Sequence, residues 1–134
     1  MFERINHVGI AVDELDEALA QYDQQFGVEL LHRELLDGGT IDAALVCAGE
    51  DRLELVAPLA SDSPLGRFLS TRGSGIHHIG YEVDDIEAAM ARLREREVRL
   101  IDDAPRPGIR GTRVAFLHPS SCLGVLTELV QQAS

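Results

Sequence analysis

A segment near the start of this chain returns in its second half, and this repeat constrains the fold more than any other feature of the sequence. Residues 5–12 (INHVGIAV) reappear as residues 76–83 (IHHIGYEV), 71 positions later, and the acidic stretch that follows each copy keeps the same offset. A Glu-Leu-Val triplet also repeats near the end of each half, 74 positions apart. Such internal similarity indicates two copies of one structural module.

The length and composition indicate a small soluble protein. A chain of 134 residues has the size of one domain and can bury a hydrophobic core without cross-links. Its two cysteines, Cys47 and Cys122, give no disulfide framework, which favours a reducing, cytoplasmic compartment. No apolar stretch has the length of a membrane span. The formal net charge of −11 argues against nucleic acid or an anionic membrane surface as a partner.

The first copy is predicted to fold as a β-α-β-β-β module. Residues 3–12 alternate and favour β-branched side chains, as in a strand with one buried face. Asp13 offers an N-cap for a helix that Gly27 ends. The apolar stripe of this helix is Leu15, Ala18, Leu19, Tyr22 and Phe26. Three further strands are expected at residues 28–36, 41–48 and 52–57.

The second copy is expected to repeat this order. A strand begins at Ile76, and a helix over about residues 84–97 follows, with an inner face of Ile86, Ala89, Met90 and Leu93. The remaining strands are expected near residues 98–102, 112–117 and 124–131. Residues 61–74 read as a short linker helix with Pro64 in its first turn, followed by a glycine-rich hinge. We therefore expect one domain of residues 1–134, with module one at about 1–60 and module two at about 75–134.

Two histidines and two glutamates occupy equivalent positions of the repeat. His7 and His78 lie in the first strand of each module, and Glu54 and Glu128 lie within apolar strands near each module's end. Burying an unpaired carboxylate is costly, so each glutamate must be solvated, paired or bound to a metal. One such residue alone would most simply face water or fill an ordinary core position. All four together favour one metal site with two imidazole and two carboxylate ligands, suited to Co, Mn, Ni, Zn or Fe.

His77 competes with His78 for the role of ligand. The repeat favours His78, because it aligns with His7, whereas His77 aligns with Asn6. Side chains alternate along a strand, so each chosen histidine shares a face with the glycine two residues later. Small residues at these positions leave room for the imidazole rings.

Several segments together resemble the vicinal-oxygen-chelate superfamily of glyoxalases, bleomycin-resistance proteins and dioxygenases, and within it the methylmalonyl-CoA epimerases. The resemblance covers essentially the whole chain. It rests on residues 7–12 (HVGIAV), 53–58 (LELVAP), 63–64 (SP) with 68–69 (FL), 75–79 (GIHHI), 83–86 (VDDI), 116–119 (FLHP) and 124–129 (GVLTEL). The ordered set is fairly specific, although the first segment alone is shared with glyoxalases and resistance proteins.

The resemblance implies a fold, a metal and a reaction. The implied fold is α+β, with two tandem βαβββ modules forming a cupped, incompletely closed mixed β-sheet barrel and helices outside. One divalent ion would be held by His7, Glu54, His78 and Glu128. The family often has Gln or Glu at the position of Glu54. The implied reaction interconverts the epimers of 2-methylmalonyl-CoA, an acyl-CoA substrate.

Epimerisation removes the proton between a thioester and a carboxylate and returns it from the other face, so two acid–base groups are needed. The resemblance implies that Glu128 serves as both ligand and base. Asp42, a charge inside the apolar run of residues 41–46, is the candidate for the second base. A solvent-facing Asp42 is the alternative, since the segment before it departs from the family's pattern. Serines replace the lysine that usually follows His118-Pro119, which leaves the substrate's identity more open than the fold.

Two other functions stay open. A glyoxalase-like lyase or isomerase would use the same ion on a different small substrate, and a resistance-type protein would bind a small molecule without chemistry. Three arginines around residues 106–113 either contact a nucleotide phosphate or are simply solvated. A homodimer is expected, because twofold pairing is the commonest way to bury an apolar outer face.

Overall fold

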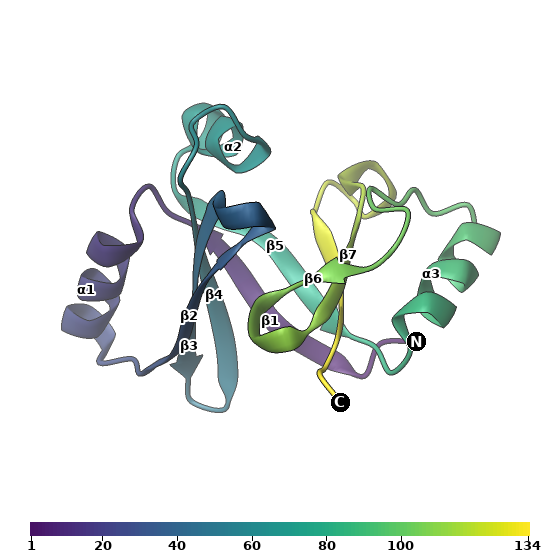
Figure 1. Ribbon diagram of the computed structural model, residues 1–134, viewed down its shortest axis with the longest axis horizontal. Helices are drawn as coiled ribbons and strands as arrows, with labels where there is room; N and C mark the ends of the chain where they lie inside the picture. Colours follow the sequence, from purple (N-terminus) through teal and green to yellow (C-terminus); the bar gives the residue numbers. More distant parts are fainter. The chain divides into compact units, whose positions relative to one another are not determined.

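The computed structural model describes all residues from 1 to 134 and contains three α-helices and an eight-stranded sheet. In chain order the elements are β1 (Arg4–Ala11), α1 (Leu15–Phe26), β2 (Leu30–Leu36), β3 (Ile41–Ala48), β4 (Asp51–Pro58), α2 (Pro64–Arg72), β5 (Gly75–Glu82), α3 (Ile86–Glu95), β6 (Arg106–Pro107), β7 (Arg113–Leu117) and β8 (Thr127–Gln131). The strand order is β2-β3-β4-β1-β5-β8-β7-β6 (Figure 1). The predicted α+β class and the βαβββ order of both copies are confirmed.

Each copy combines one parallel pair of strands with two antiparallel pairs. β1 pairs in parallel with β4, and β5 pairs in parallel with β8. The pairs β2–β3, β3–β4, β6–β7 and β7–β8 are antiparallel. The repeat seen in the sequence therefore extends to strand direction, which places equivalent residues of the two copies at equivalent positions on their strands.

The chain forms two compact units, and each boundary between them lies inside a strand. One unit is Val8–His77, and the other is Met1–His7 together with His78–Ser134. β1 and β5 therefore contribute residues to both units. The expected single domain, with modules divided at about residues 60 and 75, stays a prediction, because these units follow a different division of the chain.

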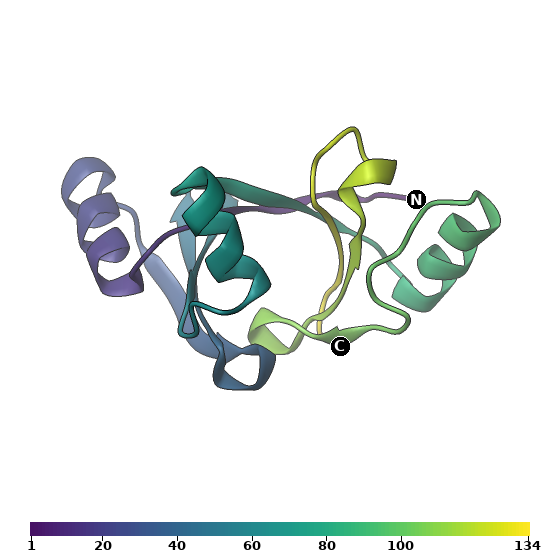
Figure 2. The ribbon, with the colours of Figure 1, turned by 90° about the horizontal axis from the view of Figure 1, so that it is seen from above.

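In the unit Val8–His77, α1 packs against β3 and β4 (Figure 1, Figure 2). The buried cluster there is Val12, Leu15, Ala44, Leu55 and Ala57, with Ala18, Leu19 and Tyr22 packed against it. The predicted stripe of α1 is thus confirmed except at Phe26, which is 67% exposed and contacts the ring of Tyr22. Phe26 lies in the last turn of the helix, just before Gly27 takes the left-handed conformation (φ 62°).

The predicted N-cap of α1 is wrong. The helix begins at Leu15, so the capping position falls on Glu14, whose side chain makes no capping hydrogen bond. By contrast, α2 begins as expected, with Pro64 in its first turn and the Ser63 hydroxyl accepting a hydrogen bond from the Gly66 N–H at 3.0 Å.

In the other unit, α3 covers one face of β7 and β8. The predicted inner face is confirmed, because Ile86, Ala89, Met90 and Leu93 are buried together with Ala115, Leu117 and Leu129. Asp85 caps the helix, its carboxylate accepting a hydrogen bond from the Ala88 N–H at 3.0 Å. Cys122 packs at the edge of this cluster, and both cysteines of the chain are free, as predicted.

The prediction of a strand near residues 98–102 is wrong. Only Leu100 forms a bridge there, to Leu117, and the second strand of this module is instead the two-residue β6. Asp102 explains part of the difference, because its carboxylate accepts the Phe116 N–H at 2.8 Å in place of a backbone carbonyl. The strand expected from residue 124 begins only at Thr127, since Leu123 and Gly124 both have positive φ. None of the three helices has the length and apolar character that crossing a bilayer requires.

Candidate metal centre

The strand registers place both glutamates beside the glycines of the repeat. In β1 and β4, Gly9 pairs with Glu54, and in β5 and β8, Gly80 pairs with Glu128. Each glycine follows a histidine of the repeat by two residues, so it shares that histidine's face of the strand. The same arrangement therefore occurs twice, once in each copy, and it brings a carboxylate next to a histidine-bearing strand each time.

Three of the predicted ligands converge within the unit that contains His7 and residues 78–134. The Nε2 atoms of His7 and His78 are 3.0 Å apart. Oε1 of Glu128 lies 2.9 Å from Nε2 of His7 and 3.5 Å from Nε2 of His78. The three residues are 3%, 2% and 5% exposed, in the order His7, His78 and Glu128. Two imidazole nitrogens and a carboxylate oxygen thus meet in a site that is almost closed to solvent.

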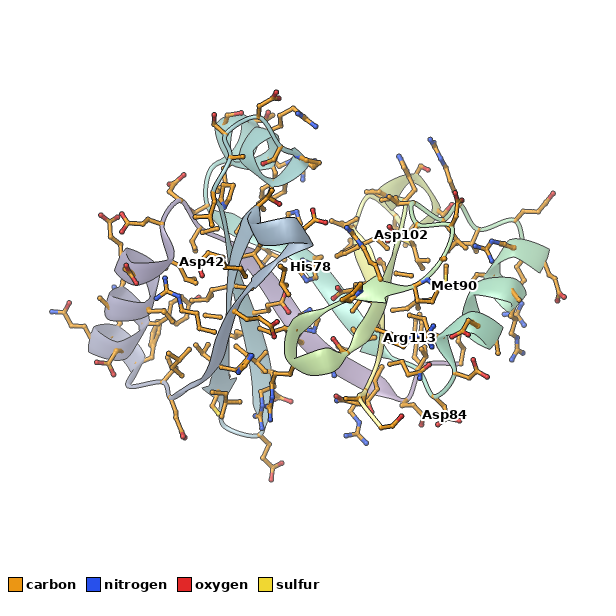
Figure 3. All side chains as sticks on the ribbon, viewed as in Figure 1. Asp42, His78, Asp84, Met90, Asp102 and Arg113 are labelled. Carbon is orange, nitrogen blue, oxygen red and sulfur yellow. The ribbon has the colours of Figure 1, made fainter.

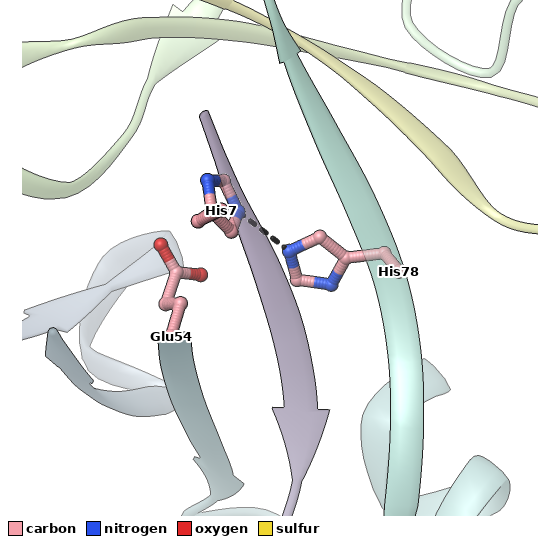
Figure 4. Close-up of side chains that lie close together, drawn as sticks. All are labelled: His7, Glu54 and His78. Carbon is pink, nitrogen blue, oxygen red and sulfur yellow. Dashed lines mark hydrogen bonds between the residues drawn. The ribbon is translucent and has the colours of Figure 1, made fainter. Parts of the chain in front are cut away.

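Glu54 also carries a buried carboxylate and lies on β4 beside β1. Donor atoms of His7, Glu54 and His78 all lie within 4.8 Å of one another, and Figure 4 shows the three side chains. These residues form a buried group that could hold a metal ion. The structure therefore brings together the residue types that the repeat indicated.

The distances fit a divalent ion. Adjacent ligands around an ion with bonds of about 2.1 Å lie about 3.0 Å apart in octahedral and about 3.4 Å apart in tetrahedral geometry. The separations of 2.9, 3.0 and 3.5 Å between the donor atoms of His7, His78 and Glu128 are each within about 0.1 Å of one of these two values. Oε1 of Glu128 is also buried without a hydrogen bond of good geometry. Lone pairs so close together repel one another unless a cation or a proton lies between them.

The electrostatics keep Glu128 ionised. Burial opposes its ionisation, but the hydrogen bond with the His7 imidazole and the electrostatic effects of His78, His7 and Arg106 outweigh burial and hold the pKa of Glu128 below its ordinary value. A carboxylate that stays ionised in a closed site is what a metal ligand requires.

Gly80 is essential to this packing. A Cβ atom at Gly80 would lie 2.4 Å from Cε1 and 2.8 Å from Nδ1 of His7, and 3.0 Å from Oε1 of Glu128. The expectation that small residues leave room for the imidazoles is thus confirmed at this position.

Replacing Gly80 by alanine is therefore expected to weaken metal binding at least about 10-fold, because the methyl group displaces two donor side chains. Titration calorimetry with Co²⁺ measures the change. Gly75→Ala is the matched control in the same strand, since a Cβ there would meet nothing within 4 Å. Equal affinities of the two variants would show that His7 and Glu128 do not bind the ion.

Asp42 lies on the opposite face of the β3–β4 pair from Glu54. In β3 and β4, Asp42 pairs with Ala57 on the face that packs against α1, whereas Glu54 pairs with Leu45 on the opposite face. The Asp42 carboxylate is held by Arg33, with Nε–Oδ1 and Nη2–Oδ2 distances of 3.2 and 2.8 Å. Arg33 also donates to Asp16 of α1 at 2.6 Å. Asp42 is thus neither next to Glu54 nor simply facing solvent, and it ties β3 to β2 and α1.

The remaining candidates are His77 and the arginines near residues 106–113, and their surroundings differ. The His77 ring contacts Phe68 edge to face, with centroids 4.9 Å apart. Arg113 forms an ion pair with Glu87 of α3, on the side of β7 where Met90 lies (Figure 3). Arg106 instead lies over the Phe116 ring, 5.2 Å from its centroid. The Phe116 ring in turn meets His78 edge to face at 5.5 Å. Arg106 and Arg113 therefore have different partners, an aromatic ring and a carboxylate.

Sequence reasoning missed Asn6. Its Oδ1 lies 2.8 Å from Nδ1 of His7 and accepts a hydrogen bond from it. Nδ1 is the ring nitrogen of His7 that does not face His78 and Glu128. The sequence does show that Asn6 directly precedes a predicted ligand. Whether its side chain can hydrogen-bond to the neighbouring ring depends on the local geometry, which a sequence pattern does not give.

Comparisons with known proteins agree over the whole chain. Residues 6–116 match the family model of the glyoxalase/bleomycin resistance protein/dioxygenase superfamily. The mitochondrial methylmalonyl-CoA epimerase of Bos taurus is 40% identical over 129 residues, which cover 96% of this chain and 74% of that protein. The ethylmalonyl-CoA/methylmalonyl-CoA epimerase of Cereibacter sphaeroides is 39% identical over 133 residues, or 98% of this chain and 99% of that protein. A solved structure of a Streptomyces coelicolor methylmalonyl-CoA epimerase variant, in complex with 2-nitronate-propionyl-CoA, has a TM-score of 0.93 at 36% identity and covers 100% of both chains.

Proposed function

This chain belongs to the methylmalonyl-CoA epimerase family of the glyoxalase/bleomycin resistance/dioxygenase superfamily, and we propose on that basis that it interconverts the two epimers of 2-methylmalonyl-CoA. The observation that carries the proposal is the buried convergence of His7, His78 and Glu128. With Glu54, these side chains would hold one divalent ion, for which mixed imidazole and carboxylate ligands suit Co, Mn, Ni, Zn or Fe.

The residues of this chain account for the first half of the reaction. When bound, a divalent ion stabilises the negative charge that develops on the thioester oxygen as the α-proton leaves. Glu128 would accept that proton, because its carboxylate is ionised and lies beside the histidine ligands. The surrounding burial would keep bulk water from competing for the proton.

Solvent deuterium exchange tests the proposal. The protein, loaded with Co²⁺ or Mn²⁺, is incubated in D₂O with one epimer of methylmalonyl-CoA, and mass spectrometry with chiral analysis follows the 2-position. Incorporation of one deuterium together with loss of stereochemical purity is expected. Ethylmalonyl-CoA is assayed in parallel, because one relative is named for both substrates.

The same experiment separates the rival functions. Turnover of a glyoxalase substrate without exchange in methylmalonyl-CoA would identify a glyoxalase-like enzyme. Binding of an acyl-CoA without exchange, in a protein shown to hold its metal, would identify a binding protein. Either result would overturn the proposal.

Replacing Asp42 by asparagine is expected to lower the free energy of unfolding by about 1 kcal/mol and to leave the exchange rate within about twofold. The variant weakens the ion pair with Arg33 but leaves the face of β4 that carries Glu54 unchanged. Urea unfolding and the deuterium assay provide the two measurements. Asp62→Asn is the control, because Asp62 pairs with Arg67 while fully exposed and should change neither. A 100-fold loss of exchange in Asp42→Asn, with metal binding retained, would instead support a catalytic role for Asp42.

The homodimer stays part of the proposal. Apolar side chains such as Ile76 and Leu35 are more than half exposed in the single chain, and pairing would cover surface of this kind. Light scattering at micromolar concentration measures the mass directly, and a monomer would refute this part alone.

A further inference from the structure

We propose that Asn6, held in one orientation by Glu82, is a positioning residue that fixes the tautomer of His7 and so presents the Nε2 lone pair of His7 to the metal. The inference rests on the proposed metal site and concerns residues outside the ligand set. All of the residues involved belong to the unit of residues 1–7 and 78–134.

The first step is the orientation of the Asn6 amide. Its Nδ2 donates to Oε2 of Glu82 at 3.4 Å. A carboxylate only accepts hydrogen bonds, so it selects the NH₂ end of the amide. Gln132 donates to the same oxygen of Glu82 at 3.3 Å, which holds the carboxylate from a second side. The amide of Asn6 is therefore set with its carbonyl oxygen turned away from Glu82.

The second step is the tautomer of His7. The Asn6 carbonyl oxygen lies 2.8 Å from Nδ1 of His7 and can only accept a hydrogen bond. A neutral imidazole has one N–H, so a proton fixed on Nδ1 leaves Nε2 with its lone pair. Nε2 is the atom that lies 2.9 Å from Oε1 of Glu128 and 3.0 Å from Nε2 of His78. Glu82 thus decides, through one amide, which nitrogen of His7 carries the lone pair that can bind the metal.

The third step is energetic. In the other tautomer of His7, a proton on Nε2 would occupy the place of the ion, and metal binding would first have to move it to Nδ1. Outer hydrogen-bond partners of metal-ligating histidines typically change metal affinity by about 10- to 100-fold. Asn6→Ala should therefore weaken Co²⁺ binding by about that factor, while Asn6→Asp keeps an acceptor at Nδ1 and should restore most of the affinity.

Two readouts on the full-length protein test the inference. Long-range ¹⁵N–¹H correlation spectra of the metal-free protein report the His7 tautomer, with the signal assigned by its loss in His7→Gln. Calorimetric titration with Co²⁺ reports affinity. The wild type is expected to show protonated Nδ1 and Asn6→Ala a mixture of tautomers. Asp62→Asn is the control, because Asp62 is fully exposed and pairs with Arg67 outside this chain of hydrogen bonds, so it should leave the tautomer and the affinity unchanged. Saturating metal should return the kcat of Asn6→Ala close to that of the wild type, which a general loss of folding would not permit.

The results that test this inference can be told apart from the results that test the proposed function. Normal Co²⁺ affinity and an unchanged His7 tautomer in Asn6→Ala would overturn the inference and leave the epimerase proposal intact. A wild type that binds metal but exchanges no deuterium would overturn the epimerase proposal, while loss of affinity in Asn6→Ala with rescue by Asn6→Asp would still support the inference. A wild type that binds no metal would overturn both.

Discussion

Replacing His78 by alanine should remove high-affinity metal binding. Zinc sites of four protein ligands bind with about 10–16 kcal/mol, or about 3 kcal/mol for each ligand, so that losing one ligand lowers the affinity on the order of 100-fold. His78 is almost fully buried, and its Nε2 is 3.0 Å from that of His7. The alanine side chain offers no donor atom in place of the ring nitrogen. The neighbouring Phe116 ring, which contacts His78, is apolar and offers none either. Calorimetry with Co²⁺ measures the affinity directly.

The neighbouring histidine provides the matched control. His77→Ala removes an imidazole one residue earlier in β5, and that ring contacts Phe68. This variant should therefore bind Co²⁺ as the wild type does. Thermal unfolding gives an independent measure, because a ligand present at 100 times its dissociation constant stabilises the folded state by about 2.7 kcal/mol. Addition of Co²⁺ should raise the melting temperature of the wild type and of His77→Ala but not that of His78→Ala, and the reverse pattern would show that the repeat selected the wrong histidine.

The repeat predicted equivalent positions for the two histidines and the two glutamates, because it carries information that a single copy lacks. One histidine in a strand can be a core residue, but His7 and His78 at equivalent positions imply equivalent neighbours. The registers agree with this argument, since Gly9 pairs with Glu54 and Gly80 with Glu128. Period-two and period-3.6 patterns predicted β1 and the inner faces of α1 and α3, because burial of one face determines both patterns.

Other features could not be predicted because they depend on contacts between distant residues. The strand expected near residues 98–102 has suitable side chains, but Asp102 supplies a side-chain acceptor to Phe116 where a regular ladder would use a carbonyl. Asp42 is a charge within an apolar strand, as a catalytic acid would be, yet its partner Arg33 lies on the adjacent strand, nine residues earlier. A buried charge in a sequence indicates that a partner exists, and only the fold shows whether that partner is a metal, a substrate or an arginine.

Replacing Glu128 by glutamine is expected to reduce the rate of deuterium exchange by about 10²- to 10⁴-fold, the usual contribution of a general base. The amide keeps an oxygen near His7 and His78 but cannot accept the α-proton, so catalysis should fall far more than metal affinity. Exchange rates measured at saturating Co²⁺, together with calorimetry, separate the two effects.

Glu54→Gln is the matched control for this prediction, because it makes the same chemical change in the equivalent residue of the other copy. Both glutamates are 5% exposed and both pair with a glycine two residues after a histidine. In the proposed function Glu54 acts only as a ligand, a role that a glutamine oxygen can also fill. Exchange should persist in Glu54→Gln and fail in Glu128→Gln. Equal losses in both variants would mean that the two carboxylates serve the metal alone and that the proton is taken by another group.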